Sequence, residues 1–127
     1  MQEPFQTQDE SVKKITFYHN PRCSKSRQAL ELLRARKVEP EIVEYLKSPP
    51  SLDELDRILK LLQLEPRALM RKQESVYKDL ALSDESLDRH SLLQAMVEHP
   101  ILIERPIAVG NGRAALGRPP ENVLDVI

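Results

Sequence analysis

The feature that most constrains this fold is a turn, residues 19–27, that joins a predicted strand to a predicted helix. The strand pattern, residues 14–18, is short and rich in β-branched and aromatic side chains, which is typical of a buried strand. The helix pattern has apolar side chains at helical spacing among Arg, Lys and Glu, namely Ala29, Leu30, Leu32 and Leu33. The turn holds Cys23, the only cysteine of the chain, which is therefore predicted to lie where the helix begins.

This position favours a reactive thiol at Cys23. The first backbone N–H groups of a helix have no intrahelical partner, and the helix dipole places partial positive charge there, so a thiolate is stabilised. The neighbours are polar and basic, and Ser24 and Ser26 can donate to or cap the same loop. The alternative is a buried cysteine that acts as a small hydrophobic residue, which is common for free cysteines. We favour the reactive thiol.

Length and composition limit the remaining possibilities. A chain of 127 residues with 40% hydrophobic positions predicts one compact domain. A formal net charge of −1 argues against nucleic-acid binding through bulk electrostatics. A single cysteine excludes an internal disulfide and a cysteine zinc cage, so a redox role requires a thiol from another molecule.

The amino-terminal segment and the hydropathy pattern indicate a cytoplasmic setting. Residues 1–10 have neither an apolar h-region nor a basic n-region, so we expect no secretory signal and interpret residues 1–13 as a flexible polar tail. The chain has no apolar run long enough to span a bilayer, so no membrane association is expected. We expect a reducing cytoplasm.

The pattern after the first helix predicts an α/β fold with a helical insertion. Residues 38–40 break the helix, and residues 41–46 have strand-like content, which together with the first strand predicts a right-handed βαβ unit. Residues 51–54 have the form of a capping box, with Ser51 as N-cap. From residue 65 to residue 100 the chain is helical by pattern. Its predicted helices are one opened by Pro66, one presenting Val76, Tyr77 and Leu80, and one from about residue 86 presenting Leu87, Leu92, Leu93, Met96 and Val97.

The last part of the chain returns to β content over residues 101–109. The sequence Gly110-Asn111-Gly112 tolerates positive φ and predicts a hairpin with a return strand over residues 113–117. A final helix is predicted to carry Val123, Leu124 and Ile127 on one side.

Four arginines lie near predicted ends of elements: Arg27, Arg71, Arg105 and Arg118. Arg105 and Arg118 each precede a proline, which disfavours helical backbone geometry at both. A guanidinium presents a planar fork of donors that matches an oxyanion, so a thiol with several arginines predicts an oxyanion site. The alternative is that these arginines lie on the surface. Pro106 is either a strand-edge proline or a cis-proline, and the sequence leaves both open.

The histidines carry less information. His19, four residues before Cys23, either favours the thiolate by hydrogen bonding or charge, or is a loop histidine. His90 and His99 are interpreted as structural, with His99 at a helix carboxyl end that favours a cation. No close pattern of His, Cys and carboxylates appears, so no metal site is predicted.

From residue 15 to residue 127 the sequence resembles the glutaredoxin-coupled, ArsC-like arsenate reductases and their shorter relatives, which have a thioredoxin-like fold. The matching pieces are Tyr18-His19-Asn20-Pro21 before Cys23, Ser26-Arg27, Glu39-Pro40, Tyr45-Leu46, Ser48-Pro49-Pro50, Arg67-Ala68-Leu69-Met70-Arg71, residues 99–107 and Gly117-Arg118-Pro119. Several separate motifs in the same order make the resemblance specific.

The resemblance implies a fold and a reaction. The fold is an α/β thioredoxin-like domain over residues 14–127, with a mixed four-stranded sheet and a helical insertion over about residues 51–100. Cys23 is the nucleophile that forms an adduct with arsenate, and Arg71, Arg105 and Arg118 bind the oxyanion. His19, Ser26 and Arg27 support the site, and Pro106 stands where thioredoxin-like folds have a cis-proline facing the cysteine. Glutathione is the co-substrate, glutaredoxin resolves the mixed species, and no bound cofactor is expected.

Two other functions stay open at this point. One is a glutathione-dependent thiol oxidoreductase that acts on a different substrate. The other is a regulator that binds RNA polymerase, as the Spx-like relatives of this fold do. Those relatives often carry a Cys-x-x-Cys switch, whose second position is Ser26 in this chain.

Overall fold

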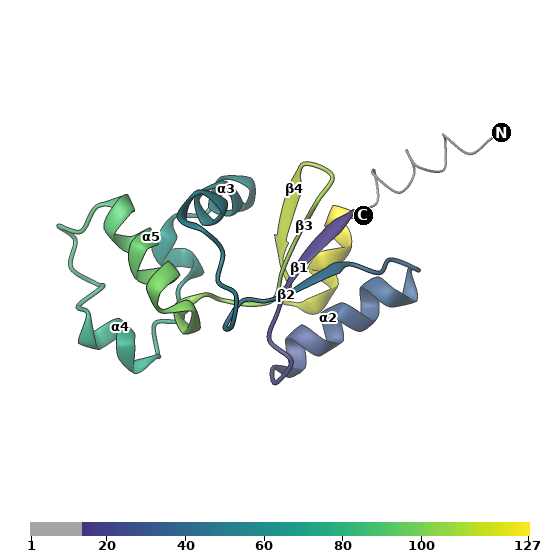
Figure 1. Cartoon of the computed structure of the whole chain (residues 1–127), viewed down its shortest axis with the longest axis horizontal. Coiled ribbons are helices and arrows are strands. Elements are labelled where there is room, and N and C mark those ends of the chain that lie inside the picture. Colours follow the sequence, from purple (N-terminus) through teal and green to yellow (C-terminus); the bar gives the residue numbers. More distant parts are fainter. Residues whose placement is uncertain (1–13) are drawn as a thin grey trace. The chain divides into compact units, whose positions relative to one another are not determined.

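The structure, a computed structural model, describes residues 14–127, so the predicted tail over residues 1–13 lies outside the described residues. The described residues form two compact units, one of residues 14–43 with residues 105–127 and the other of residues 44–104. The elements, in which η denotes a 3-10 helix, are β1 (Ile15–His19), α2 (Ser24–Ala35), β2 (Glu41–Glu44), α3 (Leu52–Leu62), η1 (Pro66–Leu69), α4 (Ser75–Asp79), α5 (Arg89–Glu98), η2 (Pro100–Leu102), β3 (Ile107–Gly110), β4 (Arg113–Leu116) and η3 (Pro120–Val126) (Figure 1).

The first unit is built on a four-stranded sheet in the order β2-β1-β3-β4. Strand β3 is antiparallel to β1, with Phe17 opposite Ala108, and antiparallel to β4, with Ile107 opposite Leu116. The sheet is mixed, as the sequence predicts. Strand β1 is central and buried because its residues are β-branched or aromatic, whereas the short edge strand β2 carries Glu at both ends.

Helices α2 and η3 pack together beside the sheet and form the core of the first unit (Figure 1). The apolar stripe predicted on α2 is the part of that helix that enters the core. The core side chains are Ile15, Phe17, Ala29, Leu30, Leu33, Val38, Ala108, Ala115, Val123 and Val126. Side chains two residues apart on a strand face the same side, so Ile15 and Phe17 both point to this core. The packed core fixes where α2 begins, and therefore where the turn before it lies.

The hairpin between β3 and β4 is confirmed. Asn111 and Gly112 have φ angles of 53° and 74°, which are the positive values required by a type I′ turn. Gly110 pairs with Ile15 of β1, and a Cβ at Gly110 would collide with the Ile15 side chain. The glycines therefore serve two separate needs, close approach of a strand at residue 110 and turn conformation at residue 112.

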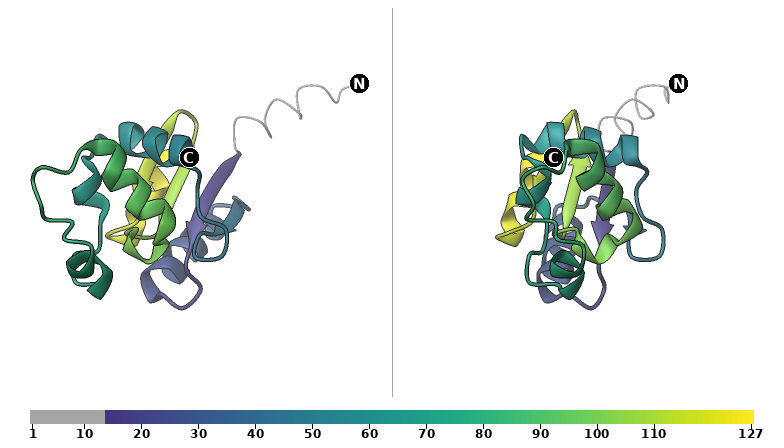
Figure 2. Two further views of the ribbon diagram at one scale, coloured as in Figure 1. Left: turned by 60° about the vertical axis from the view of Figure 1, so that its left-hand side comes forward. Right: turned by 90° about the vertical axis from the view of Figure 1, so that its left-hand side faces the viewer.

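The second unit consists of helices and turns. Ser51 caps α3 through the predicted capping box: its Oγ accepts from the Glu54 N–H at 3.1 Å, and the Ser51 N–H donates to the Glu54 carboxylate at 2.8 Å. Helices α3 and α5 pack against one another (Figure 2) and are joined by an ion pair of 2.7 Å between Asp56 and Arg89. The 3-10 helix η1 begins at Pro66, as predicted.

The predicted start of the helix at about residue 86 is wrong by three residues. Helix α5 begins at Arg89 because the side chain of Asp88 accepts a hydrogen bond of 2.9 Å from the Ser91 N–H. Leu87 therefore lies outside the helix.

The prediction of strand content from residue 101 is also wrong at its start. Pro100 begins the 3-10 helix η2, and only Ile103 makes an isolated bridge, with Met70. Strand β3 begins at Ile107. The hydropathy of this run fits a strand, but the proline opens a helical turn, which the Leu102 N–H closes by donating to His99 O at 2.9 Å.

The final helix has a different period from the predicted one. It is a 3-10 helix, so side chains three residues apart share a face, and the buried pair is Val123 and Val126. Ile127, which the prediction placed on the buried side, is 41% exposed.

Candidate active site

The turn between β1 and α2 is closed by its own backbone. The Cys23 N–H donates to Asn20 O at 3.0 Å, and the Arg22 N–H donates to Asn20 Oδ1 at 3.0 Å. Cys23 is the N-cap residue of α2, with extended φ and ψ of −94° and 123°. The prediction that the thiol lies at the start of the helix is confirmed.

Ser26 attaches this turn to the end of β1. Its side chain is fully buried, and its Oγ accepts from the Asn20 N–H at 3.1 Å and shares a hydrogen bond of 2.6 Å with His19 Nδ1. His19 is itself buried and lies against the Phe17 ring, with 5.4 Å between ring centroids. Both residues thus hold the turn in place. The predicted effect of His19 on the thiolate stays a prediction.

The environment of Cys23 favours the thiolate. Burial raises the pKa of the thiol, but four favourable contacts outweigh it: hydrogen bonding from the Ser26 N–H, the positive charge of Arg105, hydrogen bonding from the Lys25 N–H, and a hydrogen bond from the Arg105 side chain. The net pKa of Cys23 is lowered, and the residue is partly exposed. A lowered pKa with access to solvent is typical of a nucleophilic cysteine.

The lowered pKa can be tested directly, because Cys23 is the only thiol of the chain. The thiolate is the form that reacts with iodoacetamide, so alkylation accelerates as the pH rises through the pKa. For the folded protein, we expect the midpoint of this pH–rate profile at a lower pH than for the same protein unfolded in urea. An equal or higher midpoint in the folded protein would contradict the assigned environment.

Arg105 and Arg118 meet at one end of the β3–β4 hairpin. Ile107 pairs with Leu116, so the residues just outside this pair are neighbours. Arg118 Nε donates to Arg105 O at 3.1 Å, and the Gly117 N–H donates to Pro106 O at 2.8 Å. The hairpin therefore brings two of the predicted oxyanion-binding arginines together, and Arg105 also lies against the thiol.

The peptide bond between Arg105 and Pro106 is cis, which decides the question that the sequence left open. The bond between Arg118 and Pro119 is also cis, and nothing in the sequence analysis singled it out.

Gly117 is a site residue that the sequence analysis quoted only within a motif. A Cβ at Gly117 would lie 2.6 Å from Pro106 Cγ and 3.1 Å from Val123 Cγ1, so only glycine fits between β4 and Pro106. The signal for it was local: a glycine directly before an Arg-Pro pair, where the chain leaves a strand.

We expect Gly117→Ala to displace Pro106 and the adjoining Arg105, and so to lower kcat/KM about tenfold, since small displacements of a reacting group are costly. The matched control is Gly112→Ala in the turn. Its φ of 74° makes the substitution cost about 1 kcal/mol of stability without contacting the site. If Gly117→Ala lost only stability, as Gly112→Ala should, the positioning role of Gly117 would be wrong.

Arg27 has a structural contact at the same turn. Its Nη1 donates to Pro21 O at 2.9 Å, so the side chain spans the loop that carries Cys23. Its predicted part in binding an anion stays a prediction.

Arg71 belongs to the second unit, where it follows η1. Its backbone N–H donates to Leu102 O at 2.7 Å, beside the bridge between Met70 and Ile103. Its guanidinium forms an ion pair of 2.7 Å with Glu74 and a longer one of 3.9 Å with Glu104. These two carboxylates were not singled out from the sequence, although Glu74 lies only three residues after Arg71.

The sequence profile of the ArsC family matches residues 18–126, which include the thiol turn and all three predicted oxyanion-binding arginines. The chain belongs to the ArsC family.

Known proteins resemble this ArsC-family chain over most of its length. The Escherichia coli protein YfgD, described as uncharacterised, is 52% identical over 117 residues, which cover 91% of this chain and 98% of YfgD. An arsenate reductase from Neisseria meningitidis is 49% identical, covering 89% of this chain and 97% of the relative. The solved structure of an arsenate reductase from Vibrio cholerae is 50% identical, with a TM-score of 0.87, covering 90% of this chain and 98% of that one. The predicted thioredoxin-like α/β fold is thus confirmed.

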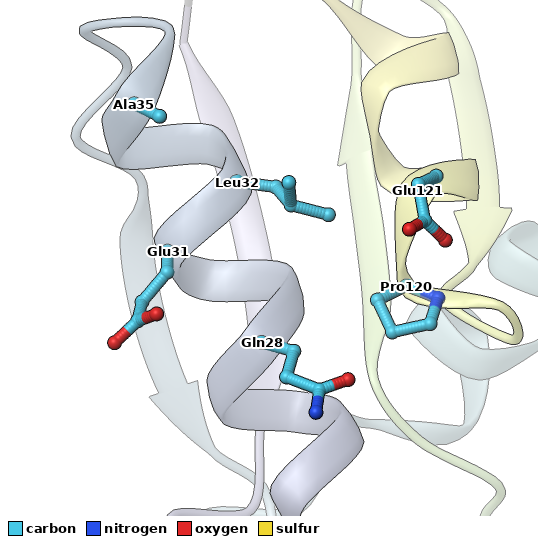
Figure 3. A pocket seen from close by; sticks show the side chains of 6 residues that line it. All are labelled: Gln28, Glu31, Leu32, Ala35, Pro120 and Glu121. Carbon is cyan, nitrogen blue, oxygen red and sulfur yellow. The ribbon is translucent and has the colours of Figure 1, made fainter.

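An open groove of about 430 Å³ lies between α2 and η3 of the ArsC-family chain (Figure 3). Its lining residues are Gln28, Glu31, Leu32, Ala35, Pro120 and Glu121. None of these is Cys23 or a predicted oxyanion-binding arginine.

Two further observations concern residues 14–127 alone. Within this part of the ArsC-family chain, no group of three or more His, Cys, Asp and Glu side chains is arranged to hold a metal ion. None of the helices there combines the length and hydrophobicity that crossing a membrane requires.

Proposed function

We propose that this protein is an oxidoreductase that reduces arsenate to arsenite, with Cys23 as the nucleophile. The observation that carries the proposal is the contact between the Arg105 guanidinium and a Cys23 thiol whose pKa is lowered at the start of α2. Membership of the ArsC family supports it, as do the relatives named arsenate reductase at 49% and 50% identity.

The reaction begins with attack of the Cys23 thiolate on arsenic. The new sulfur–arsenic bond replaces an arsenic–oxygen bond, whose oxygen leaves as water after protonation. Arsenic is still in its +5 state in this adduct. Two outside thiols then supply the two electrons. The glutathione thiol displaces a second oxygen of the adduct as water, which gives a Cys23–sulfur–arsenic–sulfur–glutathione species. The glutaredoxin thiolate attacks the glutathione sulfur and forms a mixed disulfide; the glutathione sulfur–arsenic bond breaks and its electron pair stays on arsenic, which becomes As(III). Water then replaces the Cys23 sulfur on arsenic, so arsenite is released and the Cys23 thiol is restored. The chain has no second cysteine that could take the place of either thiol.

The arginines neutralise the oxyanion as the adduct forms. Arg105 and Arg118 lie at one hairpin end, and Arg105 is beside the thiol, so one cation serves both the nucleophile and the incoming anion. We assign Arg71 to the same oxyanion, with a guanidinium that offers several donors in a planar fork. Such donors act most strongly where negative charge develops during attack.

The scheme requires no bound cofactor, because glutathione is a co-substrate and arsenic is the electron acceptor. It does require a thiol that stays reduced between turnovers. We therefore place the protein in a reducing cytoplasm, with glutathione and glutaredoxin as its partners.

The test is a coupled assay with arsenate, glutathione and glutaredoxin, in which arsenite is quantified directly. Wild-type protein is expected to produce arsenite, and omission of any of the three components is expected to stop it. A known arsenate reductase run in parallel validates the conditions.

Absence of arsenite under conditions in which the known reductase works would refute the proposal. If the intact mass of the protein then showed a glutathione adduct on Cys23, a thiol oxidoreductase with another substrate would be the better function. Recovery of RNA polymerase subunits with the protein would favour the regulatory alternative.

A further inference from the structure

The guanidinium of Arg71 is already occupied by carboxylates. Nη1 lies 2.7 Å from Glu74 Oε2, and Nε lies 3.9 Å from Glu104 Oε1. The three side chains are only 30%, 25% and 25% exposed, so water screens these charges less than it does on an open surface.

The two carboxylates have charge of the same sign as an oxyanion. An anion that approaches the Arg71 guanidinium is therefore repelled by them while they stay in place, and it competes with Glu74 for the same N–H donors. If Arg71 binds the oxyanion, as the proposed function states, at least the closer carboxylate must lose its contact.

The alternative interpretation is that Glu74 positions the Arg71 guanidinium and thereby assists binding of the oxyanion. The backbone around Arg71 does not depend on this ion pair, because its N–H donates to Leu102 O at 2.7 Å and the Glu104 N–H donates to Leu69 O at 2.8 Å. The Glu74 N–H also donates to Arg71 O at 3.2 Å, a contact that persists whatever the Glu74 side chain does. The carboxylate of Glu74 therefore acts on the Arg71 guanidinium and not on the backbone, and the two interpretations predict opposite effects of its removal on anion binding.

We propose that Glu74 competes with the oxyanion for Arg71. The resting protein holds this arginine in an ion pair with Glu74, and the oxyanion binds by displacing that carboxylate. Glu74 thus lowers the affinity of the site for anions, and only an anion that binds Arg71 more strongly than the Glu74 carboxylate does can displace it. This inference rests on the proposed role of Arg71 and adds a specificity-determining residue to it.

The test measures arsenate binding by calorimetry in a Cys23→Ser background, in which no adduct can form. We expect Glu74→Gln to tighten arsenate binding about three- to tenfold, because it removes the negative charge and leaves only a neutral amide oxygen to compete for Arg71. Glu74→Asp keeps the charge but shortens the side chain. Its affinity for arsenate is expected to lie between that of the Cys23→Ser parent and that of Glu74→Gln. The matched control is Glu39→Gln, which removes the same charge from an ion pair of 2.9 Å with Arg34 and is expected to leave binding unchanged.

Arg71→Ala distinguishes the role of Arg71 in binding the oxyanion from the competition by Glu74. If it weakens arsenate binding while Glu74→Gln does not tighten it, competition by Glu74 is wrong and the role of Arg71 stands. If Arg71→Ala binds arsenate as well as its parent does, Arg71 does not bind the oxyanion and the inference is wrong, whatever the coupled assay shows. If the parent binds too weakly to titrate, Glu74→Gln must bring binding into range, and failure to do so overturns the inference. Thermal unfolding midpoints verify that each variant is folded.

Discussion

Replacement of Cys23 with serine is expected to abolish arsenite production. A serine hydroxyl is not ionised near neutral pH, so the nucleophile is lost, and no other cysteine of the chain can replace it. We expect the rate in the coupled assay to fall at least about 10³-fold, the scale seen when an enzyme loses its nucleophile.

The fold of this variant should be intact, because the turn is held by backbone hydrogen bonds and a serine hydroxyl can accept from the same N–H groups at the start of α2. An unchanged thermal unfolding midpoint, with retained binding of arsenate, would show that only the chemistry is lost. A Cys23→Ser variant within tenfold of the wild-type rate would place the nucleophile elsewhere and remove the basis of the mechanism.

Local signals explain what the sequence predicted well. The capping box at Ser51 and Glu54 and the turn at Asn111 and Gly112 are each set by residues a few positions apart, and both formed as expected. The start of α2 at Cys23 follows from the change between a strand pattern and a helix pattern. These features depend little on the rest of the molecule.

The missed features depend on contacts between distant segments. The fit of Gly117 against Pro106 exists only once the hairpin has closed, so the local Gly-Arg-Pro sequence marks the residue but does not predict the contact. The ion pair between Arg71 and Glu104 joins residues 33 positions apart, because η2 returns the chain to the end of η1. The error at Ile127 has a different cause: the sequence pattern was read with an α-helical period, whereas the segment is a 3-10 helix.

Ser26 shows how the structure sharpens a sequence observation. In a Cys-x-x-Cys pair this position holds the second thiol, so the sequence alone shows only that the second cysteine is replaced by serine. In the structure it is fully buried, its Oγ is hydrogen bonded to Asn20 N and His19 Nδ1, and its backbone N–H stabilises the Cys23 thiolate. Ser26 therefore holds the turn that carries Cys23, and in the proposed reaction the resolving thiol comes from another molecule.

Arg105→Ala is expected to lower kcat/KM by about 30- to 1000-fold, equivalent to about 2 to 4 kcal/mol of transition-state stabilisation. The side chain stabilises the thiolate by charge and by a hydrogen bond, so its removal should also raise the pKa of Cys23 and move the alkylation profile to higher pH. Arg118→Ala is expected to reduce activity on the same scale through the oxyanion.

The matched control is Arg113→Ala, at the opposite end of the same hairpin, where Nη1 donates to Asp125 O at 3.1 Å. It removes one guanidinium and one contact to a carbonyl oxygen, and we expect both the rate and the alkylation profile to be unchanged. Arg105→Lys should recover the charge but not the planar fork of donors, and therefore restore the thiol pKa more fully than the rate. If Arg105→Ala matched the Arg113→Ala control in both measurements, Arg105 would have no part in the reaction. If it moved only the alkylation profile, its role would be confined to the thiolate, and the oxyanion would be bound by other side chains.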